Sequence, residues 1–433
     1  MKKKLFSGLL CGVLAIAAVT GCGSANKAEA TNESAKESVT VEGAAELSGK
    51  LVMMTNSTGG TYEAVEGIVQ DFMNQNPGVK IDLSSQGSDY ESLMKAKMAA
   101  NDLPDVFATH GWSVNRYSEY LLTLNDQDWY QNLDDEIIPV ISDKNGTIYT
   151  MPLNIDKAGI IYNTAILEKI GCDIPKTLDQ LLDCCGKAKA AGYTPVYLAG
   201  KDAGKTAGLL NILLNSFMAA GEDNEVEALK AGTITDDAFV PVFDFVVELK
   251  DKGYFNVDYV TADPTSIPEK LASGQVLFAL ESNSTMADAY ALNSNSTLAM
   301  MPVPTTNENT KVFLTGGEKE AYGIWKDSKN QKLAKALLNF MARPENIEKV
   351  SAGSGMPVSM KNATSNLDSK IQESYDKYSD IRVLNKFDRE CFPNGMWSTM
   401  KTVGTSLIAG DLNSKEASKM FFTDYTNFKS QNK

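Results

Sequence analysis

The chain has 433 residues, with 41 lysines and arginines against 55 aspartates and glutamates, which gives a formal net charge of −14. Such an excess of negative charge disfavours nucleic acids and other polyanions as partners. Hydrophobic residues make up 43% of the sequence, so a globular fold is expected. His110 is the one histidine, which excludes a histidine-rich zinc site and leaves a Ser-His-Asp triad only if His110 served it. We expect no metal, no cofactor and no catalytic residue.

The amino-terminal residues predict export and tethering to a membrane. Three lysines precede an apolar run from Leu5 to Val19, which has the form of a signal peptide and is short for a membrane span. The run ends in "VTGC", which resembles the cleavage site of bacterial lipoproteins. Residues 1–21 would then be removed, Cys22 would carry the lipid, and the net charge would become −17. The alternative is an ordinary secretory cleavage site that happens to contain a cysteine.

Residues 22–46 predict a flexible tether. They are rich in Ala, Ser, Glu, Lys, Thr and Asn without periodicity, so they cannot bury enough surface to offset the entropy of ordering. The chain that follows is long enough for two lobes with well-formed cores. No internal repeat and no second low-complexity linker interrupts it, so the lobes are expected to be joined by several crossings of the chain.

Within about sixty residues after the tether, the sequence alternates between strand and helix patterns. In chain order these are the strand "KLVMMTN", the helix "TYEAVEGIVQDFMNQNPG", the strand "VKIDLSS", the helix "DYESLMKAKMAA" and the strand "PDVFAT". Further on, Thr177 and Gln180 form a capping-box pattern before a helix that ends near Gly192. The strand "TPVYLAG" follows, and the helix "SKNQKLAKALLNFMARPE" is expected to stop at Pro344. This alternation predicts an α/β fold with ligands at the carboxyl ends of strands.

One long stretch carries a family resemblance. Residues 145–196, "NGTIYTMPLNIDKAGIIYNTAILEKIGCDIPKTLDQLLDCCGKAKAAGYTPV", resemble the family 1 extracellular solute-binding proteins of ABC sugar importers. The same resemblance continues, in order, in "FMNQNPGVKIDL", "NDLPDVFATHGW", "LASGQVLFALESNST", "TGGEKEAYGIWKDSKN" and "AGSGMPVS". It implies a two-lobed, type II periplasmic-binding-protein-like fold that closes around an oligosaccharide by hinge motion and delivers it to a permease.

The resemblance and the crossings together predict a domain organisation. Lobe 1 would comprise 47–156 and 316–355, and lobe 2 would comprise 157–315 and 356–433. The protein is expected to be a monomer, anchored through Cys22 on the extracytoplasmic face of the cell membrane, with ABC permease subunits as partners. An extracellular glycan-active enzyme, such as a glycoside hydrolase, and a passive surface adhesin are the alternatives.

Sugar recognition needs aromatic faces for pyranose rings and planar polar groups for the hydroxyls. The candidate ligand-binding residues are Asn56, Ser57, Thr58, His110, Trp112, Asn154, Asp156, Asn283, Glu318 and Trp397. They lie in loops that follow strands, at the predicted crossing "PLNIDKAG", and in the Pro/Gly-broken segment "DRECFPNGMW". Asn283 belongs to "ESN", where many family members have an aromatic residue, so an aromatic platform is missing here or supplied elsewhere.

Each candidate also has a structural alternative. Trp112 and Trp397 could be buried anchors, Asn56 to Thr58 could form a turn, and Glu318 could cap one. The cysteines beyond Cys22 are expected to be free, packed thiols, although a Cys172 to Cys391 disulfide stays open.

Overall fold

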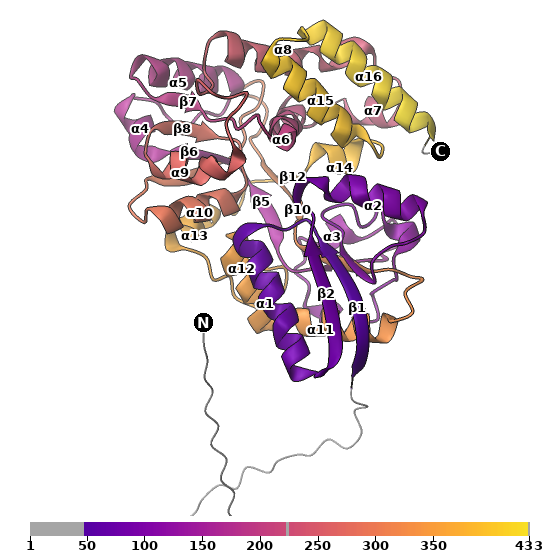
Figure 1. Ribbon diagram of the computed structural model, residues 1–433. Helices are drawn as coiled ribbons and strands as arrows, with labels where there is room; N and C mark the ends of the chain where they lie inside the picture. The colour runs from indigo at the N-terminus through magenta and orange to yellow at the C-terminus, as the bar shows by residue number, and fades with distance from the viewer. Residues whose placement is uncertain (1–46, 222–224, 432–433) are drawn as a thin grey trace, which may run out of the picture. The chain divides into compact units, whose positions relative to one another are not determined.

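A computed structural model of the protein describes residues 47–221 and 225–431 (Figure 1). The predicted signal peptide, the predicted tether and Cys22 lie outside the described residues. The described chain is a mixed α/β structure with one sheet of five strands, one of four and one of three. We use lobe 1 for the part built around the five-stranded sheet and lobe 2 for the part built around the four-stranded sheet.

Lobe 1 contains a sheet with the strand order β2-β1-β3-β11-β4. Its strands are β1 (Ser48–Thr55), β2 (Gly78–Ser85), β3 (Val106–Ala108), β4 (Met151–Pro152) and β11 (Ala321–Ile324). Strand β1 pairs in parallel with β2 and β3, whereas β11 is antiparallel to β3 and β4. The helices of this lobe are α1 (Gly59–Gln75), α2 (Tyr90–Ala99), α3 (Ile138–Ile141), α11 (Gln331–Met341) and α12 (Pro344–Ser354).

The predicted succession of strand, helix, strand, helix and strand at the start of lobe 1 is confirmed. Helix α1 forms because its apolar residues recur at helical spacing, and Val65, Ile68, Val69 and Phe72 are all buried. The prediction for Pro344 was incomplete. The proline does follow the end of α11, but it also occupies the first turn of α12, where its missing N–H leaves no helical bond unmade.

Lobe 2 contains a sheet with the order β7-β8-β6-β9. Its strands are β6 (Ile160–Asn163), β7 (Thr194–Val196), β8 (Val276–Ala279) and β9 (Leu298–Met301). Its helices are α4 (Thr164–Lys169), α5 (Leu178–Ala190), α6 (Ala203–Leu214), α7 (Val226–Ala231), α8 (Val240–Asp251), α9 (Ile267–Ala272), α10 (Asn283–Leu292), α13 (Ser369–Lys377), α15 (Met396–Ala409) and α16 (Ser414–Gln431). The predicted capping box is present, with Thr177 and Gln180 bonded reciprocally at the start of α5.

A third sheet connects the two lobes. It has the order β12-β10-β5, formed by β5 (Ile155–Ala158), β10 (Leu314–Glu318) and β12 (Val383–Asn385), and the short helix α14 (Phe387–Cys391) follows β12. Strand β5 lies between β4 of lobe 1 and β6 of lobe 2, and β10 leads from β9 of lobe 2 to β11 of lobe 1. The predicted multiple crossings are therefore present in the described chain.

The hydrophobic core follows the same division. One cluster of buried residues packs around the lobe 1 sheet and also includes Ile155 of the connecting strand β5 and Met360, and two clusters cover the two faces of the lobe 2 sheet. The strands of the lobe 1 sheet lie within 47–156 and 316–355, whereas the exact boundaries given above stay predictions. Within the described chain, the thiols of Cys172, Cys184, Cys185 and Cys391 are free, as expected.

Gly159, between β5 and β6, allows the closest backbone approach in this region. A Cβ atom at Gly159 would lie 1.9 Å from the backbone oxygen of Met301 in β9. We therefore expect Gly159→Ala to lower the free energy of unfolding by about 3 kcal/mol, because neither backbone can move without breaking the sheet.

Gly67 provides the matched control in a denaturant titration. It is an exposed residue inside α1, and a Cβ there would meet no atom within 4 Å. Gly67→Ala should leave the unfolding free energy unchanged or raise it by up to about 1 kcal/mol. Equal stability of the two variants would contradict the proposed crowding at Gly159.

Candidate ligand-binding site

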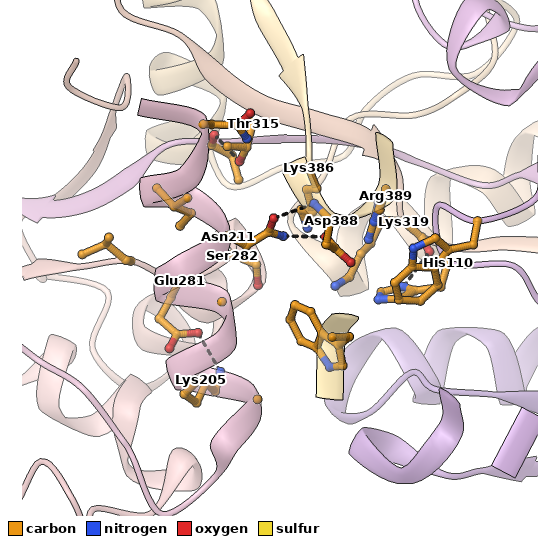
Figure 2. A pocket seen from close by; sticks show the side chains of 18 of the residues that line it. His110, Lys205, Asn211, Glu281, Ser282, Thr315, Lys319, Lys386, Asp388 and Arg389 are labelled. Carbon is orange, nitrogen blue, oxygen red and sulfur yellow. Dashed lines mark hydrogen bonds and ion pairs between the residues drawn. The ribbon is translucent and has the colours of Figure 1, made fainter. Parts of the chain in front are cut away.

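Two connected cavities are lined by residues from both lobes. The inner cavity has a volume of about 230 Å³ and is shown in Figure 2, and the outer cavity has a volume of about 670 Å³. Seven residues line both: Glu91, His110, Gly204, Lys205, Ser282, Lys319 and Trp397. The shared lining makes the two cavities one continuous space of the size typical for small-ligand sites.

The loop after β1 forms part of the wall of the outer cavity, as its position at the carboxyl end of a strand predicts. Asn56, Ser57 and Thr58 all line this cavity. Ser57 is buried, and its hydroxyl donates to the Glu320 carboxylate. The Asn56 side-chain oxygen is buried without a hydrogen-bond partner among the described residues, so it is available as an acceptor.

The turn after β3 presents His110 to both cavities and Trp112 to the inner one. His110 has a positive φ of 46° and Gly111 one of 87°, a pair of left-handed residues that turns the chain sharply. Glu318 stabilises this turn by accepting hydrogen bonds from the Gly111 N–H at 2.7 Å and from the Thr109 hydroxyl at 2.9 Å. Glu318 lines neither cavity. Its position agrees with the alternative given above, in which Glu318 caps a turn.

The two tryptophans contribute differently. Trp112 is 3% exposed, and the guanidinium of Arg116 lies 4.0 Å from its ring centroid, with that of Arg389 at 5.5 Å. Its ring is thus covered largely by cations, while its N–H lacks a partner among the described residues. Trp397, in the first turn of α15, is half-buried and lines both cavities. Trp397 therefore offers the larger free aromatic surface.

Asn154 and Asn283 line neither cavity and instead form hydrogen bonds with other residues of the protein. Asn154 is fully buried; its amide donates to the Ser354 hydroxyl and accepts from the Glu320 N–H. Asn283 donates to the backbone oxygen of Lys157 in β5. The structure does not bring these two predicted site residues into the cavities.

Asp156 also lies outside both linings, but it balances a cation at the base of the inner cavity. It is 1% exposed and forms an ion pair with Lys386. Burial alone would raise the pKa of Asp156, but the ammonium groups of Lys386 and Lys319 outweigh the effect of burial, so the pKa of Asp156 lies below its ordinary value.

Burial and the nearby Lys386 lower the pKa of Lys319 to about 8. Burial likewise lowers the pKa of His110, whose imidazole is neutral at pH 7.

Several lining residues were missed by sequence reasoning. Asp388 of α14 and Asn211 of α6 lie in the inner cavity, joined by two hydrogen bonds (Figure 2). One signal was available for Asn211, which is a polar residue inside the otherwise apolar run "LLNILL". Such a residue on a buried helix face needs a buried partner. Nothing in the sequence identifies Asp388 as that partner.

The segment after β8 contributes a charged residue to the inner cavity. Glu281 follows β8 and forms an ion pair with Lys205 of α6, with the nitrogen and oxygen 2.6 Å apart, in the wall of the inner cavity. Glu91 of α2 also lines this cavity, 3.5 Å from the Arg116 guanidinium, and burial raises its pKa to about 7. The cavity thus offers many hydrogen-bonding groups and one free indole.

Metal chemistry finds no support in the described chain. Within 47–221 and 225–431, no three His, Cys, Asp or Glu side chains are grouped so that they could hold a metal ion. No helix among the same residues is long and apolar enough to cross a membrane.

Comparison with known proteins identifies relatives over almost the whole described chain. A protein of Bacillus subtilis (strain 168), the melibiose/raffinose/stachyose-binding protein MelE, is 30% identical over 384 residues, which are 88% of this chain and 90% of the relative. A solved sugar transporter of Bacillus licheniformis in complex with stachyose is 33% identical and has a TM-score of 0.83, covering 88% of this chain and all of that one.

A second solved structure, a binding protein of Bacillus subtilis in an open conformation, is 29% identical with a TM-score of 0.80, covering 90% of this chain and 99% of that one. These likenesses confirm the two-lobed type II periplasmic-binding fold. Residues 55–348 match the family described as bacterial extracellular solute-binding protein. The chain belongs to this family of extracellular solute-binding proteins.

Proposed function

We propose that the chain is the receptor of a carbohydrate ABC importer, which binds an oligosaccharide in the cavity between its lobes and delivers it to the permease. The names of the two similar Bacillus proteins support this ligand class, since one is a melibiose/raffinose/stachyose-binding protein and the other binds stachyose. Short neutral oligosaccharides are therefore the ligands to test first.

The cavity lined by both lobes carries this proposal. Trp397 supplies an aromatic face, and His110, Lys205 and Asp388 supply donors and acceptors around it. A sugar ring has weakly polar faces and a rim of hydroxyls, so this combination suits it. Because lobe 1 and lobe 2 both contribute, a bound ligand would bridge them and favour the closed arrangement.

Tethering to the membrane fits the same function. A diacylated Cys22 would anchor the protein stably, because two acyl chains bury enough CH₂ groups where one is marginal. The tether at 22–46 would keep the lobes free to move while raising their effective concentration at the permease. We propose the anchor from the sequence motif "VTGC", and a monomer as the acting species.

The role of Trp397 can be tested by titration calorimetry with stachyose. Trp397→Ala should weaken binding by about 1.5–3 kcal/mol, a ten- to hundred-fold rise in Kd, because a large aromatic contact is lost. Trp325 lines neither cavity, so Trp325→Phe serves as the control and should bind as tightly as the wild type. Equal Kd values for the wild type and Trp397→Ala would reject stacking on this indole.

Ligand closure predicts a change in size and a weak response to salt. The radius of gyration from small-angle scattering should fall when stachyose is added, and the Kd should change less than about tenfold between low and high salt, because a neutral ligand has no charge to screen. An unchanged radius would argue against closure. Release of monosaccharides from stachyose when it is incubated with the protein would instead indicate a glycan-active enzyme.

The anchor is tested by Cys22→Ser in the full-length chain expressed in a Gram-positive host. Without the thiol no lipid can be attached, so we expect the variant to leave the membrane fraction while keeping its affinity for stachyose. Cell fractionation followed by immunoblotting measures this. A variant that stays with the membrane would refute the lipid anchor and leave the binding function untouched.

A further inference from the structure

The inner cavity contains a buried carboxylate that is only half satisfied. Asp388 is 1% exposed and lines the cavity, and its Oδ2 has no hydrogen-bond partner among the described residues. A buried acceptor without a partner is destabilising, and such groups in folded proteins generally have a reason. A group supplied by a ligand in the cavity would provide the missing donor.

Asn211 fixes the orientation of this carboxylate. Its side-chain amide donates to Asp388 Oδ1 at 2.7 Å, and its side-chain oxygen accepts from the Asp388 N–H at 3.0 Å. Figure 2 shows the two side chains joined in this way between α6 and α14. Because Asn211 binds both the carboxylate and the backbone of the same residue, Asp388 cannot turn its free oxygen away without losing these bonds.

Two cations next to Asp388 in the sequence, Lys386 and Arg389, are occupied elsewhere. Lys386 forms its ion pair with Asp156, and Arg389 donates to the backbone oxygen of Glu318 at 2.7 Å while lying over Trp112. Among the residues that the structure describes, no ion pair joins either of them to Asp388. Neither Lys386 nor Arg389 therefore satisfies Asp388 Oδ2, which is left to accept a hydrogen bond from a ligand in the cavity.

We propose, building on the proposed sugar-binding function, that Asp388 determines specificity by accepting a hydrogen bond from a hydroxyl of the sugar ring in the inner cavity. Asn211 is the residue that positions it. The ligand class is then a neutral glycoside with a free hydroxyl at this point. A ligand that presents no hydroxyl at this point is disfavoured, since a site built to bond a hydroxyl strongly rejects ligands that leave its buried groups unpaired.

Titration calorimetry and thermal melting of the full chain test this proposal with stachyose as the probe. Asp388→Asn should raise the Kd at least thirtyfold without lowering the melting temperature, because a charged acceptor is lost but the shape is kept. Asp244→Asn, at an exposed aspartate of α8, is the matched control and should change neither quantity. A lower melting temperature with an unchanged Kd would show that Asp388 is structural and overturn the proposal.

A double-mutant cycle tests the positioning role. Asn211→Ala should weaken stachyose binding in the wild type but cost little more in Asp388→Asn, since Asn211 acts through that carboxylate. Additive losses would contradict this.

The outcomes separate this inference from the function on which it rests. If the wild type binds none of stachyose, raffinose and melibiose, the proposed function is rejected, and the role of Asp388 with it. If the wild type binds one of them and Asp388→Asn binds it equally well, the sugar-binding function stands and the role of Asp388 alone is rejected.

Discussion

The pairing of β10 with β5 and β12 is the constraint on which the rest of the structure depends. It places the crossings of the chain side by side, and it does so through Gly316, where a Cβ would lie 2.1 Å from Val383 Cγ1 and 2.8 Å from the Asp156 oxygen. Only glycine permits that approach. Because the three strands are this close, Lys319 after β10 and Lys386 after β12 reach the base of the inner cavity together, and Asp156 on β5 is there to balance them.

This arrangement explains why the polar residues at the crossings bond to other parts of the protein instead of lining the cavity. Asn154, Asp156 and Glu318 are each at most 1% exposed, and an unpaired polar group at such depth would be costly. Asn154 and Glu318 make hydrogen bonds that fix a turn or join segments distant in the chain, and Asp156 forms the ion pair with Lys386. The sequence pattern correctly located a polar crossing. Because these side chains are buried there, their hydrogen bonds and ion pair hold in place the residues that do line the cavity.

The features that could be predicted from the sequence are those set by residues close to one another in the chain. Apolar spacing and turn residues sufficed for β1 to β3 with α1 and α2, and the spacing of Thr177 and Gln180 sufficed for the start of α5. Loops that follow strands gave Asn56, His110 and their neighbours, because the carboxyl ends of parallel strands form one edge. Asp388 could not be found in this way, since its partner Asn211 is 177 residues distant and only the packing of α14 on α6 brings them together.

The charged residues that line the inner cavity also bear on the kind of ligand that it can bind. The chain as a whole is acidic, yet four cations, Lys205, Lys319, Lys386 and Arg389, line the inner cavity. Lys205 and Lys386 form ion pairs with carboxylates, and Arg389 contacts a backbone oxygen and an indole, whereas Lys319 has its pKa lowered to about 8 by burial and stays mostly protonated at pH 7. Because most of these charges are paired within the protein, the cavity wall offers mainly directed hydrogen bonds to a ligand. Because the Trp112 ring is covered by Arg116, and Trp397 is the other tryptophan among the residues that line the inner cavity, aromatic contact depends mainly on Trp397.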